Sequence, residues 1–114
     1  MSVPLYQAKA EMFRTLGHPV RIRVLELLQD GPRPVRDLLD EIEVEASNLS
    51  QQLSVLRRAG FVTSYREGPL VMYALSTPDL AELLAVGRRI LGAVLSDRDG
   101  LLDELRAHSQ ETSG

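Results

Sequence analysis

The most distinctive pattern in this sequence is a helical period over residues 46–59 that stops at Gly60 and gives way to two short strands. Segments 61–65 and 70–75 are rich in aromatic and β-branched residues, and Arg66-Glu67-Gly68-Pro69 between them is predicted to form a turn. Gly60 would supply the left-handed stop of the helix. The buried stripe of that helix would consist of Leu49, Leu53 and Leu56. Residues 46–75 therefore predict a helix that leads directly into a β-hairpin.

Shorter helical stretches precede this segment, and turn signals separate them. Gly17-His18-Pro19 ends a helix predicted at about 3–16, and Gly31-Pro32 ends the helical run VRIRVLELLQD. Pro34 is predicted to lie in the first turn of the next helix, which continues to Ile42. After the hairpin a long helix is predicted over residues 78–95, and Ser96-Asp97 is predicted to cap a last helix.

This order of elements predicts a mainly α fold with a small β-hairpin. Helix, helix, turn, helix and hairpin in succession is the layout of a winged helix-turn-helix domain. A chain of 114 residues suits one domain. We therefore predict a single DNA-binding domain over residues 1–110 and a frayed tail over residues 111–114.

The helix at 46–59 has the side chains expected of a helix that reads DNA. Short polar residues near its N-terminus would let it approach base edges, and Ser, Asn and Gln both donate and accept hydrogen bonds. Ser47, Ser50, Gln51 and Ser54 share one face. By its spacing alone, this face is more often a solvated polar face. The lack of acids, the hairpin that follows directly and the preceding helix that ends a few residues earlier favour DNA binding instead.

The distribution of charge supports this interpretation better than its sum. The net charge of -3 argues mildly against a polyanionic partner. Between Ala46 and Arg66, however, there are three arginines and no carboxylate. A small basic face on an acidic body is compatible with DNA binding.

Two stretches resemble the ArsR/SmtB-type winged-helix repressors. They are TLGHPVRIRVLELL and PVRDLLDEIEVEASNLSQQLSVLRRAGFVTSYREGPLVMYAL, and together they span Thr15 to Leu75. The resemblance implies a homodimer, with the first and the long C-terminal helices packed across a twofold axis. It further implies two recognition helices in successive major grooves of an inverted-repeat operator, and a sequence-specific regulator that acts as a repressor. The base-reading positions of the family correspond to Ala46, Ser47, Ser50 and Gln51.

Pattern and resemblance together define the candidate sites. Arg57 and Arg58 are placed for phosphates or for carboxylates of a neighbouring helix, Arg66 would lie near the minor groove or backbone, and Gly68 permits a tight wing tip. The candidate DNA-binding residues are Ala46, Ser47, Asn48, Ser50, Gln51, Ser54, Arg57, Arg58, Arg66 and Gly68. The apolar stripe of the C-terminal helix is too long for one small domain to cover. The candidate dimer residues are Leu5, Met12, Leu80, Leu84, Gly87, Ile90, Leu91 and Val94.

The sequence does not identify an effector. Many ArsR/SmtB relatives release DNA on binding a metal or another inducer, but this chain has no Cys for a thiolate site. Ala81 and Gly92 occupy positions where dimer-helix metal sites of the family carry His. Glu104 and His108, one helical turn apart, are the remaining candidates for a nickel or zinc site, although such a pair is more often a solvated helix end. No cofactor is required by the predicted function.

Other functions are less well supported by the residues. The chain has no Gly-rich phosphate loop, Ser-x-Gly elbow or His-Glu-x-x-His motif, so we predict no enzyme activity. It has no apolar run long enough for a membrane span and no signal-peptide layout, so we expect no membrane partner and a cytoplasmic location. The alternative that stays open is a winged-helix module that binds a protein partner, or a regulator that needs a protein co-regulator.

Overall fold

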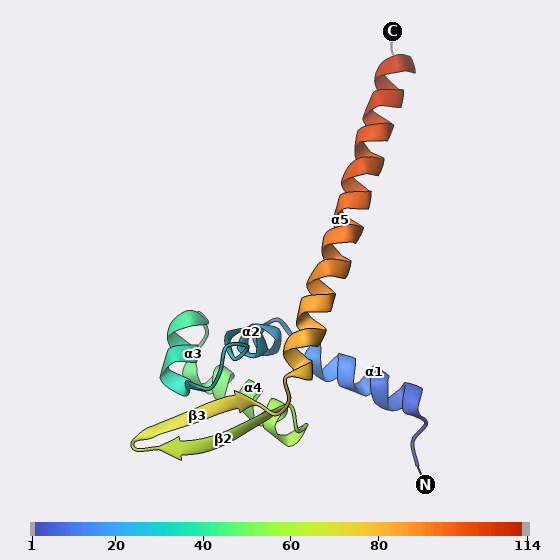
Figure 1. The fold of residues 1–114 in the computed structure, drawn as a ribbon. Helices are drawn as coiled ribbons and strands as arrows, with labels where there is room; N and C mark the ends of the chain where they lie inside the picture. Colours follow the sequence, from blue (N-terminus) through green and yellow to red (C-terminus); the bar gives the residue numbers. More distant parts are fainter. Residues whose placement is uncertain (1, 113–114) are drawn as a thin grey trace. The chain divides into compact units, whose positions relative to one another are not determined.

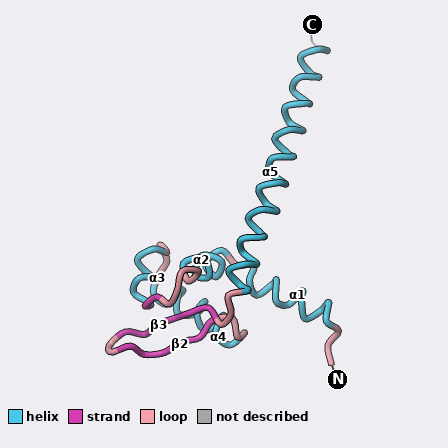
Figure 2. The backbone as a smooth tube through the Cα atoms, viewed as in Figure 1, coloured by secondary structure: helices cyan, strands magenta, loops and turns pink. Residues whose placement is uncertain are grey.

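The computed structural model describes the backbone of residues 2–112 and the side chains of residues 2–107. The chain divides into two compact units: the first ends at Ala81, and the second begins at Glu82. Figure 1 shows the helices and strands as a labelled ribbon, and Figure 2 colours the same backbone by secondary structure. In chain order they are α1 (Leu5–Leu16), α2 (Pro19–Leu27), β1 (Arg33–Pro34), α3 (Val35–Glu41), α4 (Ala46–Arg58), β2 (Val62–Glu67), β3 (Leu70–Leu75) and α5 (Asp79–Thr112).

The first unit has an aliphatic core built from α2, α3 and α4. The predicted stripe of α4 is confirmed, since Leu49, Leu53 and Leu56 are each at most 2% exposed. Leu25 of α2 and Leu38 of α3 are fully buried as well. Each such side chain stabilises the fold by about 1.5–3 kcal/mol relative to an exposed one. This core fixes α4 against α2 and leaves the polar face of α4 outside.

The sheet contains a strand that the sequence did not predict. The strand order is β1-β3-β2, with β1 paired antiparallel to β3 through Arg33 opposite Tyr73 and Pro34 opposite Met72. β1 therefore extends the predicted hairpin, which Figure 1 shows as β2 and β3, to a three-stranded sheet. The placement of Pro34 in a first helical turn was wrong, because its ψ of 151° is extended and it precedes α3 as the N-cap. Proline is compatible with this edge position because it needs no partner for an N–H group.

The hairpin turn is tighter than predicted. Arg66 and Glu67 belong to β2, where they pair with Val71 and Leu70, so only Gly68 and Pro69 form the loop. Gly68 has a φ of 61°, which suits glycine at the first central position of a two-residue loop. At the other end of β2, Gly60 has a φ of 84°, which confirms the predicted left-handed stop after α4.

His18 and Pro19 begin α2 as a capping pair. The Val20 backbone N–H donates to His18 Nδ1 at 3.2 Å, and Pro19 occupies the first helical position, where a missing N–H costs nothing. Turn chemistry therefore accounts for His18, as the sequence indicated.

The C-terminal helix is continuous where a break was predicted. α5 runs from Asp79 to Thr112, so the cap at Ser96-Asp97 was wrong. Serine and aspartate are good N-caps, but they also lie inside helices when no proline or left-handed glycine ends the preceding turn. The tail predicted at 111–114 falls partly outside the described residues.

Candidate DNA-binding surface

One face of α4 combines exposure with an absence of acidic side chains. Ser47, Ser50 and Gln51 are exposed, and so is Ala46 at the first position of the helix. The leucine stripe on the opposite face packs into the core, so these polar side chains keep the outward positions that the sequence predicted. Hydroxyl and amide groups on such a face can donate to and accept from base edges.

Asn48 and Ser54 differ from the other candidates on α4 because they are partly buried. Asn48 belongs to a hydrogen-bond chain that connects α4 to α2. Arg21 Nε donates to Gln52 Oε1 at 2.8 Å, and Gln52 Nε2 donates to Asn48 Oδ1 at 3.0 Å. Arg21 Nη1 also donates to the backbone carbonyl of Thr15 at 2.9 Å, near the C-terminal end of α1. These bonds satisfy Gln52, which is only 7% exposed.

Sequence reasoning missed this network. Neither Gln52 nor Arg21 is among the candidate residues that the sequence pattern pointed to. The two residues are 31 positions apart, and no local pattern pairs them. The available signal was a polar residue on the leucine side of the helix, since such a residue needs a buried partner.

Arginines flank the polar face of α4. Arg57 and Arg58 are exposed in its last turn, where cations also interact favourably with the helix dipole. Arg58 Nε lies 3.4 Å from the Ser54 carbonyl, a weak local bond that leaves most of the guanidinium available. Arg66 is exposed on β2, next to the exposed Glu67. The polar face thus has cations at the end of the helix and on the hairpin.

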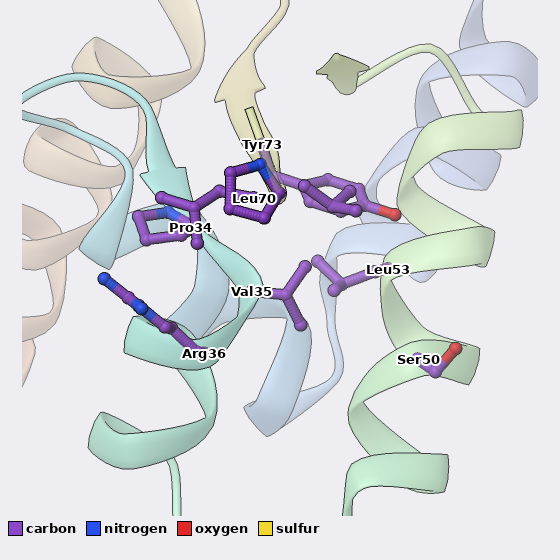
Figure 3. Close-up of a pocket in the computed structure, with 9 residues that line it drawn as sticks. Pro34, Val35, Arg36, Ser50, Leu53, Leu70 and Tyr73 are labelled. Carbon is purple, nitrogen blue, oxygen red and sulfur yellow. The ribbon is translucent and has the colours of Figure 1, made fainter. Parts of the chain in front are cut away.

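An open groove of approximately 490 Å³ separates the start of α3 from α4 and β3. In Figure 3, Val35 and Leu53 approach each other across it, the Tyr73 ring points toward α4, and Arg36 points away. The groove is mostly apolar, and Ser50 lies on its α4 side. Arg36 Nε is 3.9 Å from Asp37 Oδ1, so its charge is partly compensated.

The candidate dimer residues differ in how much surface they retain in the single chain. On α5, Ile90, Leu91 and Val94 are 59%, 58% and 42% exposed, and Leu5 of α1 is 69% exposed. Met12 and Leu84 are partly buried, and Gly87 is exposed. Leu80 is only 6% exposed, so little of its surface is left for a partner.

The metal candidates lie at the edge of the described structure. Glu104 is exposed on α5, whereas the side chain of His108 lies outside the described residues. Within the described part, no three His, Cys, Asp or Glu side chains gather where they could hold a metal ion. In that same part, no helix combines the length and hydropathy that a membrane span needs.

A buried helix-turn-helix core, an exposed polar second helix and a β-hairpin after it define a winged helix-turn-helix protein. The family model of the bacterial regulatory proteins of the arsR family matches residues 18–64. The HTH-type transcriptional regulator Rv0081 of Mycobacterium tuberculosis is 54% identical over 112 residues, which span 97% of this chain and 98% of that protein. The chain belongs to the ArsR family.

Solved structures agree with this assignment. The crystal structure of Rv0081 covers 85% of this chain and 98% of its own, with a TM-score of 0.78 and 57% identity. The transcriptional repressor BigR from Xylella fastidiosa covers 75% of this chain and 87% of its own, with a TM-score of 0.69 and 33% identity. The homodimeric winged helix-turn-helix domain of Mb0332 from Mycobacterium bovis covers 80% of this chain and 84% of its own, with a TM-score of 0.71 and 26% identity. This protein is thus a DNA-binding transcription regulator and not an enzyme.

Proposed function

We propose that the protein is a homodimeric repressor that binds an inverted-repeat operator and reads its bases with α4. The observation that carries this proposal is the exposed, acid-free polar face of α4, flanked by exposed arginines. The similarity to the repressor BigR supports repression as the outcome of binding. The site of action is then the cytoplasm, where bacterial DNA is found.

The candidate residues take two roles in this proposal. Ser50 and Gln51 contact base edges, together with Ala46 and Ser47 at the start of the helix, because short side chains there allow close approach. Arg57, Arg58 and Arg66 contact phosphates and set the position of the protein on the duplex. Gly68 keeps the wing tip small enough to approach the backbone.

The dimer is proposed from the exposed apolar side chains of α1 and α5. Leu5, Leu91 and Val94 are too exposed for a chain that remains alone in water, and a second copy would cover them. The homodimeric state of the Mb0332 domain supports this arrangement. Two linked copies present two copies of α4, as an inverted repeat requires.

A metal effector and a protein co-regulator both stay predictions. For the metal, the pair Glu104 and His108 is the candidate that the sequence offers. Calorimetric titration of nickel or zinc into wild type and His108→Ala checks it. We expect no tight binding that depends on His108, and we expect DNA affinity without added metal to be the same in both proteins.

The DNA proposal is tested by titrating wild type, Gln51→Ala and Arg66→Ala against operator and scrambled duplexes at several salt concentrations. Loss of a base contact at Gln51 should cost about 1–3 kcal/mol per half-site and relax the preference at one base position. Loss of a phosphate contact at Arg66 should weaken both duplexes alike and flatten the salt slope by about one unit. If Gln51→Ala weakens both duplexes equally, α4 is not the reader of the sequence.

A further inference from the structure

The chain of hydrogen bonds from α2 into α4 has a direction that its chemistry fixes. Arginine carries only donors, so the Gln52 amide must turn its oxygen toward Arg21. Its NH₂ group then faces Asn48, which must present Oδ1 in return. The second bond of Arg21, to the Thr15 carbonyl, holds the guanidinium in the orientation that directs Nε at Gln52.

This direction leaves one group of Asn48 for an outside partner. Among the described side chains, no buried nitrogen or oxygen lacks a hydrogen-bond partner. Asn48 Nδ2 makes no hydrogen bond within the described part of the chain, so it must be open to solvent. Asn48 lies in the first turn of α4, between the exposed Ser47 and the leucine stripe. An asparagine that is free to rotate could offer oxygen or nitrogen, but this one offers nitrogen.

We propose that Arg21, acting through Gln52, makes Asn48 a hydrogen-bond donor toward DNA. Its partner is then an acceptor: N7 of guanine or adenine, guanine O6, thymine O4, or a phosphate oxygen. The bidentate contact of asparagine with adenine, which needs its oxygen as well, is disfavoured because Oδ1 already accepts from Gln52. Arg21 and Gln52 are positioning residues, and the inference rests on the proposed role of α4 in reading DNA.

Gln52→Glu is the variant that reverses the orientation of the Asn48 amide with the least change in side-chain shape. A glutamate still accepts from Arg21, but it has no N–H for Asn48, and so the Asn48 amide must turn its NH₂ inward. Oδ1 would then face the DNA acceptor, and operator affinity should fall by about tenfold per half-site. Asn48→Ala should lose a similar amount, since it removes the same contact. Thermal unfolding should show that both variants remain folded.

The double variant Gln52→Glu/Asn48→Ala distinguishes a relay, in which Gln52 acts on DNA only by orienting the Asn48 amide, from direct repulsion between the new charge and DNA. If the relay acts through Asn48, Gln52→Glu costs nothing further once Asn48 is gone. If Gln52→Glu costs the same tenfold in both backgrounds, the added charge repels DNA directly and the inference is wrong. It is also wrong if Asn48→Ala alone leaves operator affinity unchanged.

Binding to a duplex library randomised over the operator identifies the acceptor. A base contact changes the preference of Gln52→Glu and Asn48→Ala at the same position of each half-site, whereas a phosphate contact lowers affinity for all sequences alike. Both results support a donor role for Asn48. Wild type without any sequence preference would instead overturn the proposed function itself, which keeps the two failures distinct.

Discussion

The two units of this chain differ in where their apolar side chains lie. In residues 2–81, Leu25, Leu38 and Leu56 are completely buried and belong to one core. In residues 82–107, Ile90, Leu91 and Leu101 are all more than half exposed on a single helix. The first unit is stabilised by its own packing, while α5 carries an apolar face that nothing in the second unit covers. In the proposed function, the first unit therefore reads DNA, while the proposed interface takes its exposed apolar side chains mainly from α5 and also from α1 of the first unit.

The spacing on α5 indicates what kind of surface this is. Leu91, Val94, Leu101 and Leu105 are separated by three, seven and four residues, which is the heptad spacing of helices that pack side by side. Arg98 interrupts the series at its centre. The apolar face continues beyond Val94, where the interface predicted from the sequence ended.

The largest expected effect lies in the core of the first unit. Leu56→Ala removes a side chain that is 0% exposed and should lower the free energy of unfolding by about 2–5 kcal/mol. The matched change on α5 is Leu102→Ala, at a side chain that is 48% exposed, and it should cost less than about 1 kcal/mol. Urea unfolding of the two variants checks the difference. Equal losses would mean that the face of α5 around Leu102 is as well covered as the core.

The second largest effect should be on dimerisation, while the first unit remains folded. Leu91→Glu places a charge on the apolar face of α5 and should yield a monomer at micromolar concentration, because an unpaired charge cannot be buried at an interface. Operator affinity should fall by about 100-fold or more, since the two half-sites are no longer bound by linked copies. Light scattering and DNA titration provide the measurements.

Ser96→Glu is the control for this experiment. It adds the same charge at an exposed polar position of α5 and should leave both the molecular mass and the operator affinity unchanged. A Leu91→Glu protein that remains dimeric at micromolar concentration would show that α5 does not carry the interface.

The parts of the fold that could be predicted are those with local signals. The leucine stripe of α4, the stop at Gly60 and the limits of β3 follow from periodicity and from backbone preferences of single residues. β1 could not be predicted, since two residues have no period and its pairing partner is about 40 positions away in the chain. The network of Arg21 and Gln52 was missed for the same reason, because only the packing of α2 on α4 brings the two together.

The wrong break at Ser96-Asp97 bears directly on the comparison of the two units. A predicted cap there divided the C-terminal segment into two helices, and so limited the dimer helix to residues 78–95. The structure has one helix through this region, with Gly92 and Gly100 inside it. Local cap signals cannot decide between a helix start and a helix interior when neither a proline nor a left-handed glycine ends the preceding turn, and Gly92 has no positive φ.

The smallest expected effects come from the same substitution, glycine to alanine, made separately at two positions. Gly100→Ala should stabilise the protein by about 0.5–1 kcal/mol, because alanine is the better helix residue and an added Cβ at Gly100 meets nothing within 4 Å. Gly60→Ala should destabilise it by about 1–2 kcal/mol, because φ at Gly60 is 84° and alanine is strained there even though the space is open. Chemical denaturation measures both. Opposite signs are expected because Gly60 ends a helix while Gly100 lies inside one, and a destabilising Gly100→Ala would argue that α5 is interrupted near Ser96 after all.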